Sequence, residues 1–301
     1  MYSRRKFSRL ALASLPLSAA LGKINSTIKG VQLGVCTYSF RSLPRTGPDD
    51  VDTVIQALTE CRAGQCELFS PQLEPGSSLS ERIPQEERSK RREAVRQWRL
   101  TAPVKHFKDI RKRFDTAGID IYAYTLNFDK SYTDEELEKC FEQTKAMGVK
   151  TIASSTKVSM LPRLQTLAEK HKIYVAVHGH SDTKHPDEFS SPETFQKALD
   201  MSDWFRVNLD IGHFSAAGFD PVAYINEHHD RITHLHIKDR KKDDGPNEPF
   251  GEGNTPIKQV LQLLRDKKYA IPAFVEYEYK GTGTPVEEVN KCLAYMKNAL
   301  A

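Results

Sequence analysis

Two stretches in the second half of the chain end in side chains that bind metals or move protons. Residues 205–213 and 232–239 are mostly apolar until they reach these side chains. The first run ends with Asp210 and His213, and the second with His236 and Lys238. A strand buried in a parallel sheet is almost continuously apolar. Charged and imidazole groups at its carboxyl end therefore indicate a chemical role.

Two further runs end in the same way, 173–180 at His178 and His180 and 271–278 at Glu276 and Glu278. Two imidazoles with one or two carboxylates suit a divalent ion such as Mn, Co, Zn or Fe, whereas calcium prefers oxygen ligands alone. A lone histidine at a strand end is more often a hydrogen-bonded structural residue. Four strands that all end in ligand-type side chains favour a metal site, with the ligands Asp210, His236 and Glu276. His178 stays open between a ligand and another polar role.

Further polar residues accompany these candidates. Strand alternation places His234 deeper on the face that carries His236, so we expect a buried histidine that supports a ligand. Glu67, near the end of the run 65–70, either supports a ligand or binds substrate. We expect His180, Lys238 and Glu278 to bind substrate at the mouth of the site.

The stretches between these runs predict the elements that position them. Residues 220–230 begin with an early proline and have apolar residues at helical spacing, which predicts a helix joining two parallel strands. The same strand-then-helix unit occurs eight times. The predicted strands are 31–40, 65–70, 119–126, 149–154, 173–180, 205–213, 232–239 and 271–278. The sequence thus predicts an α/β fold, a (β/α)8 TIM barrel with its catalytic groups at the carboxyl ends of the strands.

One long stretch interrupts this repeat. Residues 71–103 follow the second strand and are rich in Pro, Ser and charged residues. Their position puts them on the face where the charged strand ends meet, so we expect an insertion that covers the site. The sequence leaves open whether it is a lid or a contact between subunits of a homo-oligomer. We expect residues 27–301 to form a single barrel domain with this insertion.

The amino-terminal residues 1–26 predict a signal peptide. Adjacent arginines, Arg4 and Arg5, precede an uncharged run that ends in small residues, which is typical of a twin-arginine export signal. An amphipathic first helix is the alternative, and the apolar run is far shorter than the ~20 residues that span a bilayer. We therefore expect an exported, periplasmic protein whose mature form does not enter the membrane.

Composition excludes other classes of function. The formal net charge is +4 over 301 residues, without a basic stripe that interleaves with aromatic residues, so no nucleic-acid partner is expected. The five cysteines are odd in number and lack the spacing of a zinc site or a disulfide framework.

Several motifs, in this order and spacing, resemble those of one family. They are residues 35–40 (VCTYSF), 66–69 (CELF), 208–213 (NLDIGH), 234–239 (HLHIKD), 250–253 (FGEG) and 274–276 (FVE). The chain is similar to the xylose isomerase-like barrels, the sugar phosphate isomerase/epimerase group, across nearly all of the mature protein.

The resemblance implies a metal site and a role for each matching residue. Metal ligands are implied at His178, Asp210, His236 and Glu276, and a substrate contact at His213. In the epimerases of this family the ligand of the fifth strand is a Glu that also moves protons. Here the position carries His178, so the symmetric pair of carboxylates is lost.

The resulting hypothesis is a metal-dependent isomerase or epimerase that removes an α-proton from a carbohydrate without a phosphate group. Glu276 would be the base, and His213 or Lys238 would donate a proton. A lyase or hydratase acting on a 3-keto-glycoside is the first alternative, because one base suffices for elimination. A noncatalytic sugar-binding barrel is the second. A phosphodiester hydrolase would need more metal ligands and a basic face for DNA.

Overall fold

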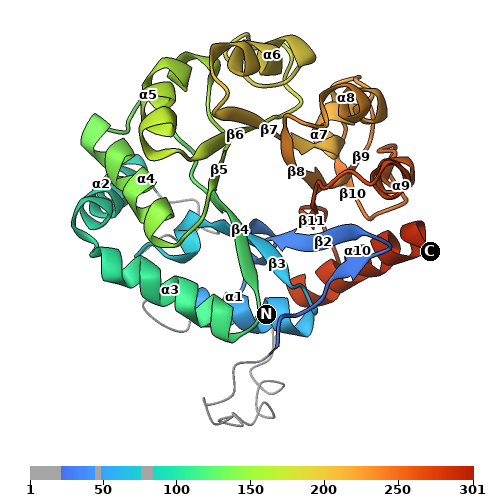
Figure 1. The fold of residues 1–301 in the computed structure, drawn as a ribbon, viewed down its shortest axis with the longest axis horizontal. Coiled ribbons are helices and arrows are strands. Elements are labelled where there is room, and N and C mark those ends of the chain that lie inside the picture. The colour runs from blue at the N-terminus through green and yellow to red at the C-terminus, as the bar shows by residue number, and fades with distance from the viewer. Residues whose placement is uncertain (1–21, 45–48, 76–83) are drawn as a thin grey trace.

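The computed structural model describes residues 22–44, 49–75 and 84–301, and it confirms the predicted barrel (Figure 1). Eight parallel strands form the wall: β2 Val31–Cys36, β3 Gln65–Phe69, β4 Asp120–Thr125, β5 Thr151–Ser154, β6 Tyr174–His178, β7 Phe205–Asp210, β8 Ile232–Ile237 and β11 Ala273–Val275. They are neighbours in this order, and β11 also pairs with β2. The last strand thus closes the sheet.

A ring of helices surrounds the wall (Figure 1). It consists of α1 Val51–Glu60, α3 Val104–Thr116, α4 Asp134–Ala146, α5 Leu161–His171, α6 Pro192–Met201, α8 Pro221–His228, α9 Ile257–Lys267 and α10 Pro285–Leu300. The short elements are β1 Thr27–Ile28, β9 Asp239–Arg240, β10 Asn247–Glu248 and the 3-10 turns Thr37–Phe40, Ser70–Gln72 and Val158–Met160. Each longer helix of this ring buries a stripe of apolar residues at helical spacing; α1, for example, buries Val51, Val54 and Leu58.

The inside of the barrel is filled in layers. Tyr122 and Phe274 pack edge to face with their ring centroids 5.7 Å apart, and both rings also contact the imidazole of His234. Next to His234 lies Glu67, which is 1% exposed. The polar groups predicted at the strand ends therefore lie above a layer of packed aromatic rings, and the site opens at one end of a filled barrel.

The predicted strand 205–213 is too long. The strand ends at Asp210, and the helix α7 Ile211–Ala216 begins at once. Asp210 causes this change, because its Oδ1 accepts a hydrogen bond from the backbone N–H of His213 at 2.7 Å and caps the helix. His213 therefore reaches the site from the first turn of a helix.

The insertion contributes one more helix, α2 Gln85–Thr101, which packs beside α4 in the outer ring (Figure 1). Arg92 and Arg99 of α2 donate to the buried carboxylate of Glu136 at 2.8–2.9 Å. Residues 76–83 of the predicted cover lie outside the described residues. No residue of 71–75 or 84–103 lines the cavity of the site.

Residues 22–28 lie against the amino-terminal end of the barrel. The backbone N–H of Ile24 donates to Gly118 O at 2.9 Å, and Ser26 Oγ accepts from Gly64 N at 3.0 Å. A Cβ on Gly64 would lie 1.8 Å from Ile24 O, so this close approach requires glycine. The predicted signal peptide 1–26 lies outside the described residues up to position 21. Within the described ranges, no helix has the length and apolar character needed to cross a bilayer.

Candidate metal centre

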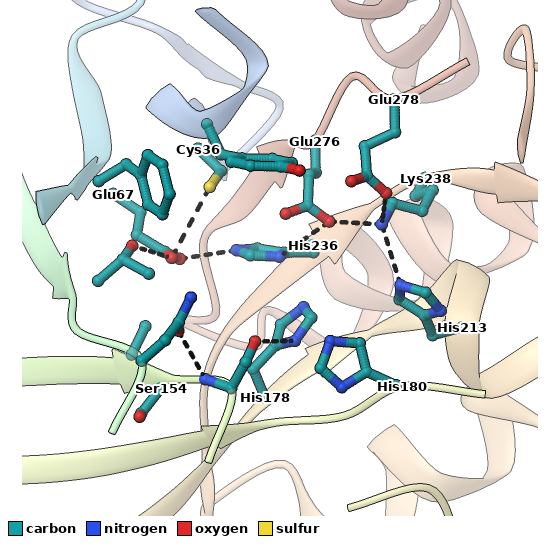
Figure 2. A pocket seen from close by; sticks show the side chains of 16 residues that line it. Cys36, Glu67, Ser154, His178, His180, His213, His236, Lys238, Glu276 and Glu278 are labelled. Atoms are coloured by element: carbon teal, nitrogen blue, oxygen red, sulfur yellow. Dashed lines mark hydrogen bonds and ion pairs between the residues drawn. The ribbon is translucent and has the colours of Figure 1, made fainter. Parts of the chain in front are cut away.

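Four side chains from neighbouring strands meet at the carboxyl end of the barrel, and Figure 2 shows three of them, His178, His236 and Glu276. His178 is the last residue of β6, Asp210 the last of β7, His236 lies near the end of β8, and Glu276 follows β11 directly. One ligand atom from each residue can be chosen so that all four lie within 4.8 Å of one another. The structure thus brings together the four residues predicted as metal ligands.

Each of these side chains directs one potential ligand atom toward the others. Among the described residues, the buried nitrogens His178 Nε2 and His236 Nδ1 have no hydrogen-bond partner, and the two carboxylate oxygens, Asp210 Oδ2 and Glu276 Oε2, have the ammonium group of Lys238 as a neighbour. His178 Nε2 lies 3.6 Å from Asp210 Oδ2, and His236 Nδ1 lies 3.4 Å from Glu276 Oε2. Buried polar atoms without partners are costly, and two nitrogens with two carboxylate oxygens match the ligands of Zn, Fe, Co or Mn. The donor set fits a divalent metal ion.

Lys238 is the cation nearest to these oxygens. Its Nζ lies 3.2 Å from Asp210 Oδ2, 2.6 Å from Glu276 Oε2 and 2.5 Å from Glu278 Oε2. Burial opposes the charge of Lys238, but the three carboxylates outweigh it and hold its pKa well above the usual range. Lys238 is therefore a permanent positive charge at the edge of the ligand set.

Glu67 supports the ligand set from beneath. Its Oε2 accepts from Nε2 of His234 at 2.6 Å and from Nε2 of His236 at 2.7 Å, and Oε1 accepts from Thr125 Oγ1 at 2.5 Å. Burial opposes ionisation of Glu67, but the charge of His236 and the hydrogen bonds from both histidines outweigh it, so its pKa lies well below the usual range. Because Glu67 holds Nε2 of His236, Nδ1 is the ring nitrogen that would bind a metal, which would displace its proton.

His213 lies beside Lys238 at the mouth. Burial, together with the charge of Lys238, lowers the pKa of His213 well below its usual range, so the ring is neutral. Arg240 Nη1 lies 2.7 Å from Nδ1 of His213. Lys238 Nζ lies 3.2 Å from Nε2, so a group that only donates faces each ring nitrogen.

A cavity of about 330 Å³ opens above the four side chains. Glu276 and Glu278 line it together with Lys238, His180 and His213, whereas Asp210 does not. Tyr38 and Phe69 also line the cavity, with their ring centroids 5.0 Å apart. The cavity therefore combines hydrogen-bonding groups with an aromatic wall, as carbohydrate sites do.

The structure gives the surroundings of three residues that were predicted to contact substrate, Glu67, His180 and Glu278. Glu67 lines the cavity, but its carboxylate is held by several side chains, which favours the supporting role over the predicted contact with substrate. His180 is 40% exposed, and its Nδ1 lies 3.8 Å from Glu188 Oε2. Glu278 lies at the mouth, where Asn247 Nδ2 contacts its Oε2 at 3.5 Å.

Sequence reasoning missed three groups at the site. Ser155 contacts His178, Arg240 contacts His213, and Asn208 donates to Glu67. Cys36 is buried but also lines the cavity. All five cysteines are free thiols, in line with their spacing in the sequence.

Comparison with known proteins identifies related chains. Residues 92–299 match the family model described as xylose isomerase-like TIM barrel. A stretch of 98 residues is 30% identical to the L-ribulose-5-phosphate 3-epimerase UlaE of Salmonella enteritidis, and it covers 33% of this chain and 34% of that protein. The chain thus spans about a third of the length of this curated relative.

Two solved structures share the fold. A sugar phosphate isomerase/epimerase from Parabacteroides distasonis has a TM-score of 0.60 at 18% identity, over 93% of this chain and 97% of that one. An IOLI protein with a zinc atom bound has a TM-score of 0.62 at 15% identity, over 90% of this chain and 98% of that one.

Proposed function

The chain belongs to the xylose isomerase-like TIM barrel family, and we propose that it is a divalent-metal-dependent isomerase or epimerase of a sugar or keto-sugar without a phosphate group. The observation that carries this proposal is the convergence of four buried potential ligand atoms, one each from His178, Asp210, His236 and Glu276, within 4.8 Å of one another. The name of the curated relative, an epimerase, supports the same class of reaction.

The metal would be held by these four residues, with Mn, Co, Zn or Fe as candidates. When bound, such an ion polarises a carbonyl or hydroxyl oxygen and thereby makes the neighbouring C–H bond more acidic. Glu67 keeps Nε2 of His236 engaged, so that Nδ1 remains available as a ligand.

Glu276 is the proposed base. Of the two carboxylates in the candidate ligand set, only Glu276 lines the cavity, where it would meet the α-carbon of a bound sugar. Proton removal by a positioned carboxylate is general base catalysis. Lys238, 2.6 Å away, stabilises the carboxylate form of Glu276.

Two neighbouring groups would hold or protonate the substrate oxygens. His213 lines the cavity, where its neutral ring would bind a substrate oxygen. Lys238 supplies a positive charge 3.2 Å from Nε2 of His213. Both groups favour a substrate oxygen on which negative charge develops during the reaction.

The charges around the cavity favour an uncharged substrate. Lys238 is the one lysine or arginine side chain among the described residues that line it, and three carboxylates already surround its ammonium group. A phosphate ester would need a cation that is free to pair with it. The predicted export signal agrees with this proposal, since phosphorylated sugars are typically cytoplasmic metabolites.

A lyase that acts on a 3-keto-glycoside is the second candidate, and His178 is the observation that favours it. With an imidazole at this position, the pair of opposed carboxylates that would exchange a proton on both faces of a carbon is missing. An elimination needs one base: Glu276 removes the α-proton, the electron pair forms a C=C bond, and the glycosidic oxygen leaves with a proton from His213 or Lys238.

Hydrogen exchange in heavy water tests both candidates. The protein, loaded with each metal in turn, is incubated with ketoses and 3-keto-glycosides, and loss of the α-proton signal is followed by NMR. We expect exchange in the wild type and in His185→Ala, whose imidazole is 71% exposed, and none in His236→Ala. Release of the aglycone would identify the lyase. Absence of exchange, with unchanged sugar affinity in His236→Ala, would instead indicate a noncatalytic sugar-binding barrel.

A further inference from the structure

The ring of His178 has one neighbour on each of its two nitrogens. Nε2 is buried, has no hydrogen-bond partner in the described part of the chain, and lies 3.6 Å from Asp210 Oδ2. Nδ1 lies 3.2 Å from the hydroxyl oxygen of Ser155. The two nitrogens therefore differ in function: one is placed for a metal and the other for a hydroxyl.

An imidazole at this position has a requirement that a carboxylate lacks. A carboxylate offers lone pairs on both oxygens, whereas a neutral imidazole offers one lone pair, on the nitrogen that does not carry the proton. Nε2 of His178 binds a metal only when the proton lies on Nδ1. That proton then needs an acceptor, and histidine ligands of metals are usually fixed by such a partner.

Ser155 is held in place to act as this acceptor. It follows β5, and its backbone N–H donates to Asn127 Oδ1 at 2.9 Å. The next residue is fixed too, because Thr156 Oγ1 donates to Phe128 O at 2.8 Å. Among the described residues His178 is the hydrogen-bond partner of the Ser155 hydroxyl, so no other acceptor or donor competes for it.

We propose that Ser155 is a positioning residue that accepts the Nδ1 proton of His178 and so directs the Nε2 lone pair into the candidate metal centre. The inference rests on the proposed function, because it requires that the centre binds a metal. It explains how this chain uses an imidazole where the resemblance implies a glutamate.

The affinity of the metal-free protein for Zn²⁺ and Co²⁺, measured by competition with a chelator, tests this proposal. We expect Ser155→Ala to weaken binding about 10-fold, and Ser155→Thr, which keeps the hydroxyl, to restore it. In a His178→Glu background, Ser155→Ala should leave the affinity unchanged, because a glutamate has no ring proton to place. Nitrogen-15 NMR of the metal-loaded wild type should show the His178 proton on Nδ1.

Melting of the metal-free variants separates a loss of folding from a loss of positioning, since the proposal predicts similar melting temperatures for Ser155→Ala and the wild type. Equal metal affinity in the wild type and Ser155→Ala would overturn the role of Ser155 alone. An equal loss in the His178→Glu background would also overturn it, because it would reveal a general structural effect. A wild type that binds neither ion would overturn the proposed function together with this inference.

Discussion

At position 178 a single side chain changes the charge of the candidate ligand set. With His178 the set has two imidazoles and two carboxylates, and with a glutamate there it would have one imidazole and three carboxylates. Nitrogen ligands favour Zn, Co and Fe, whereas carboxylates favour Mn and Mg. The histidine therefore shifts the preference of the site toward the metals that bind nitrogen.

His178→Glu should reverse this preference. We expect the ratio of the Zn²⁺ to the Mn²⁺ dissociation constant to rise about 10-fold, because the variant exchanges a nitrogen for a charged oxygen. The two constants are measured by titration of the metal-free protein. His185→Glu, which makes the same substitution at an exposed position of the loop after β6, serves as the control. An unchanged ratio in His178→Glu would show that His178 is not a ligand.

Among the longer helices, α2 is the one that the repeat did not predict, and ion pairs attach it to the barrel. Glu136 in the first turn of α4 is fully buried and accepts hydrogen bonds from Arg92 and Arg99, and Arg99 also pairs with Glu74. Most residues of α2 are polar or charged, so apolar burial contributes little to its attachment. Its position therefore depends on Glu136.

Glu136→Gln should destabilise the protein by about 3 kcal/mol, because it removes the buried carboxylate that pairs with the partly buried Arg92 and the buried Arg99. Burial opposes ionisation of Glu136, but the hydrogen bonds from Arg92 and Arg99 outweigh it and lower its pKa. A lowered pKa stabilises the fold above the ordinary value near 4.5, and this contribution is lost as the pH falls through the pKa of the folded state.

The melting temperatures of the wild type and Glu136→Gln should therefore differ most at pH 7 and converge as the pH falls through the lowered pKa of Glu136. The control is Glu86→Gln, which breaks an exposed pair with Lys90 on the same helix and should cost under about 0.5 kcal/mol. A difference that stays constant with pH would contradict the assignment of this stability to the charge of Glu136.

The sequence predicts the strands better than it predicts the contacts of the site residues. Alternating and continuous apolar runs are local signals, and they predicted all eight strands of the barrel. Ser155 and Arg240 lie in segments between the main strands and helices, and their partners His178 and His213 are 23 and 27 positions away. Nothing in the local pattern indicates such a contact. The start of helix α7 at Asp210 was missed for a different reason. In the sequence, an aspartate that caps a helix cannot be distinguished from an aspartate that ends a strand as a metal ligand.

For the molecule as a whole, residues 22–28 form part of the barrel although the predicted signal peptide extends to position 26. Ser26 is 6% exposed, and its hydroxyl donates to Leu33 O at 2.6 Å. Ile24 is partly buried against the core. A leader that is removed during export should therefore be cut before Ile24.

Two truncated proteins test this boundary. Removal of residues 1–21 should leave the melting temperature unchanged, whereas removal of 1–26 should cost about 3 kcal/mol through the loss of buried hydrogen bonds at Gly64, Gly118 and Leu33. Equal melting temperatures would show that residues 22–26 are dispensable. The mass of the protein recovered from the periplasm would give the boundary directly.

The pairing of β2 with β11 also determines when the site can exist during synthesis. Ser39 Oγ donates to Val275 O across 236 positions of sequence, and Glu276 follows immediately. A ribosome that has finished β8 has released three of the four candidate ligands, on a sheet whose two edges are still open. The final strand joins those edges and supplies the fourth ligand in the same step. The four candidate ligands would therefore be complete only after translation has reached the last strand, and a prematurely terminated chain would carry neither a closed wall nor a complete centre.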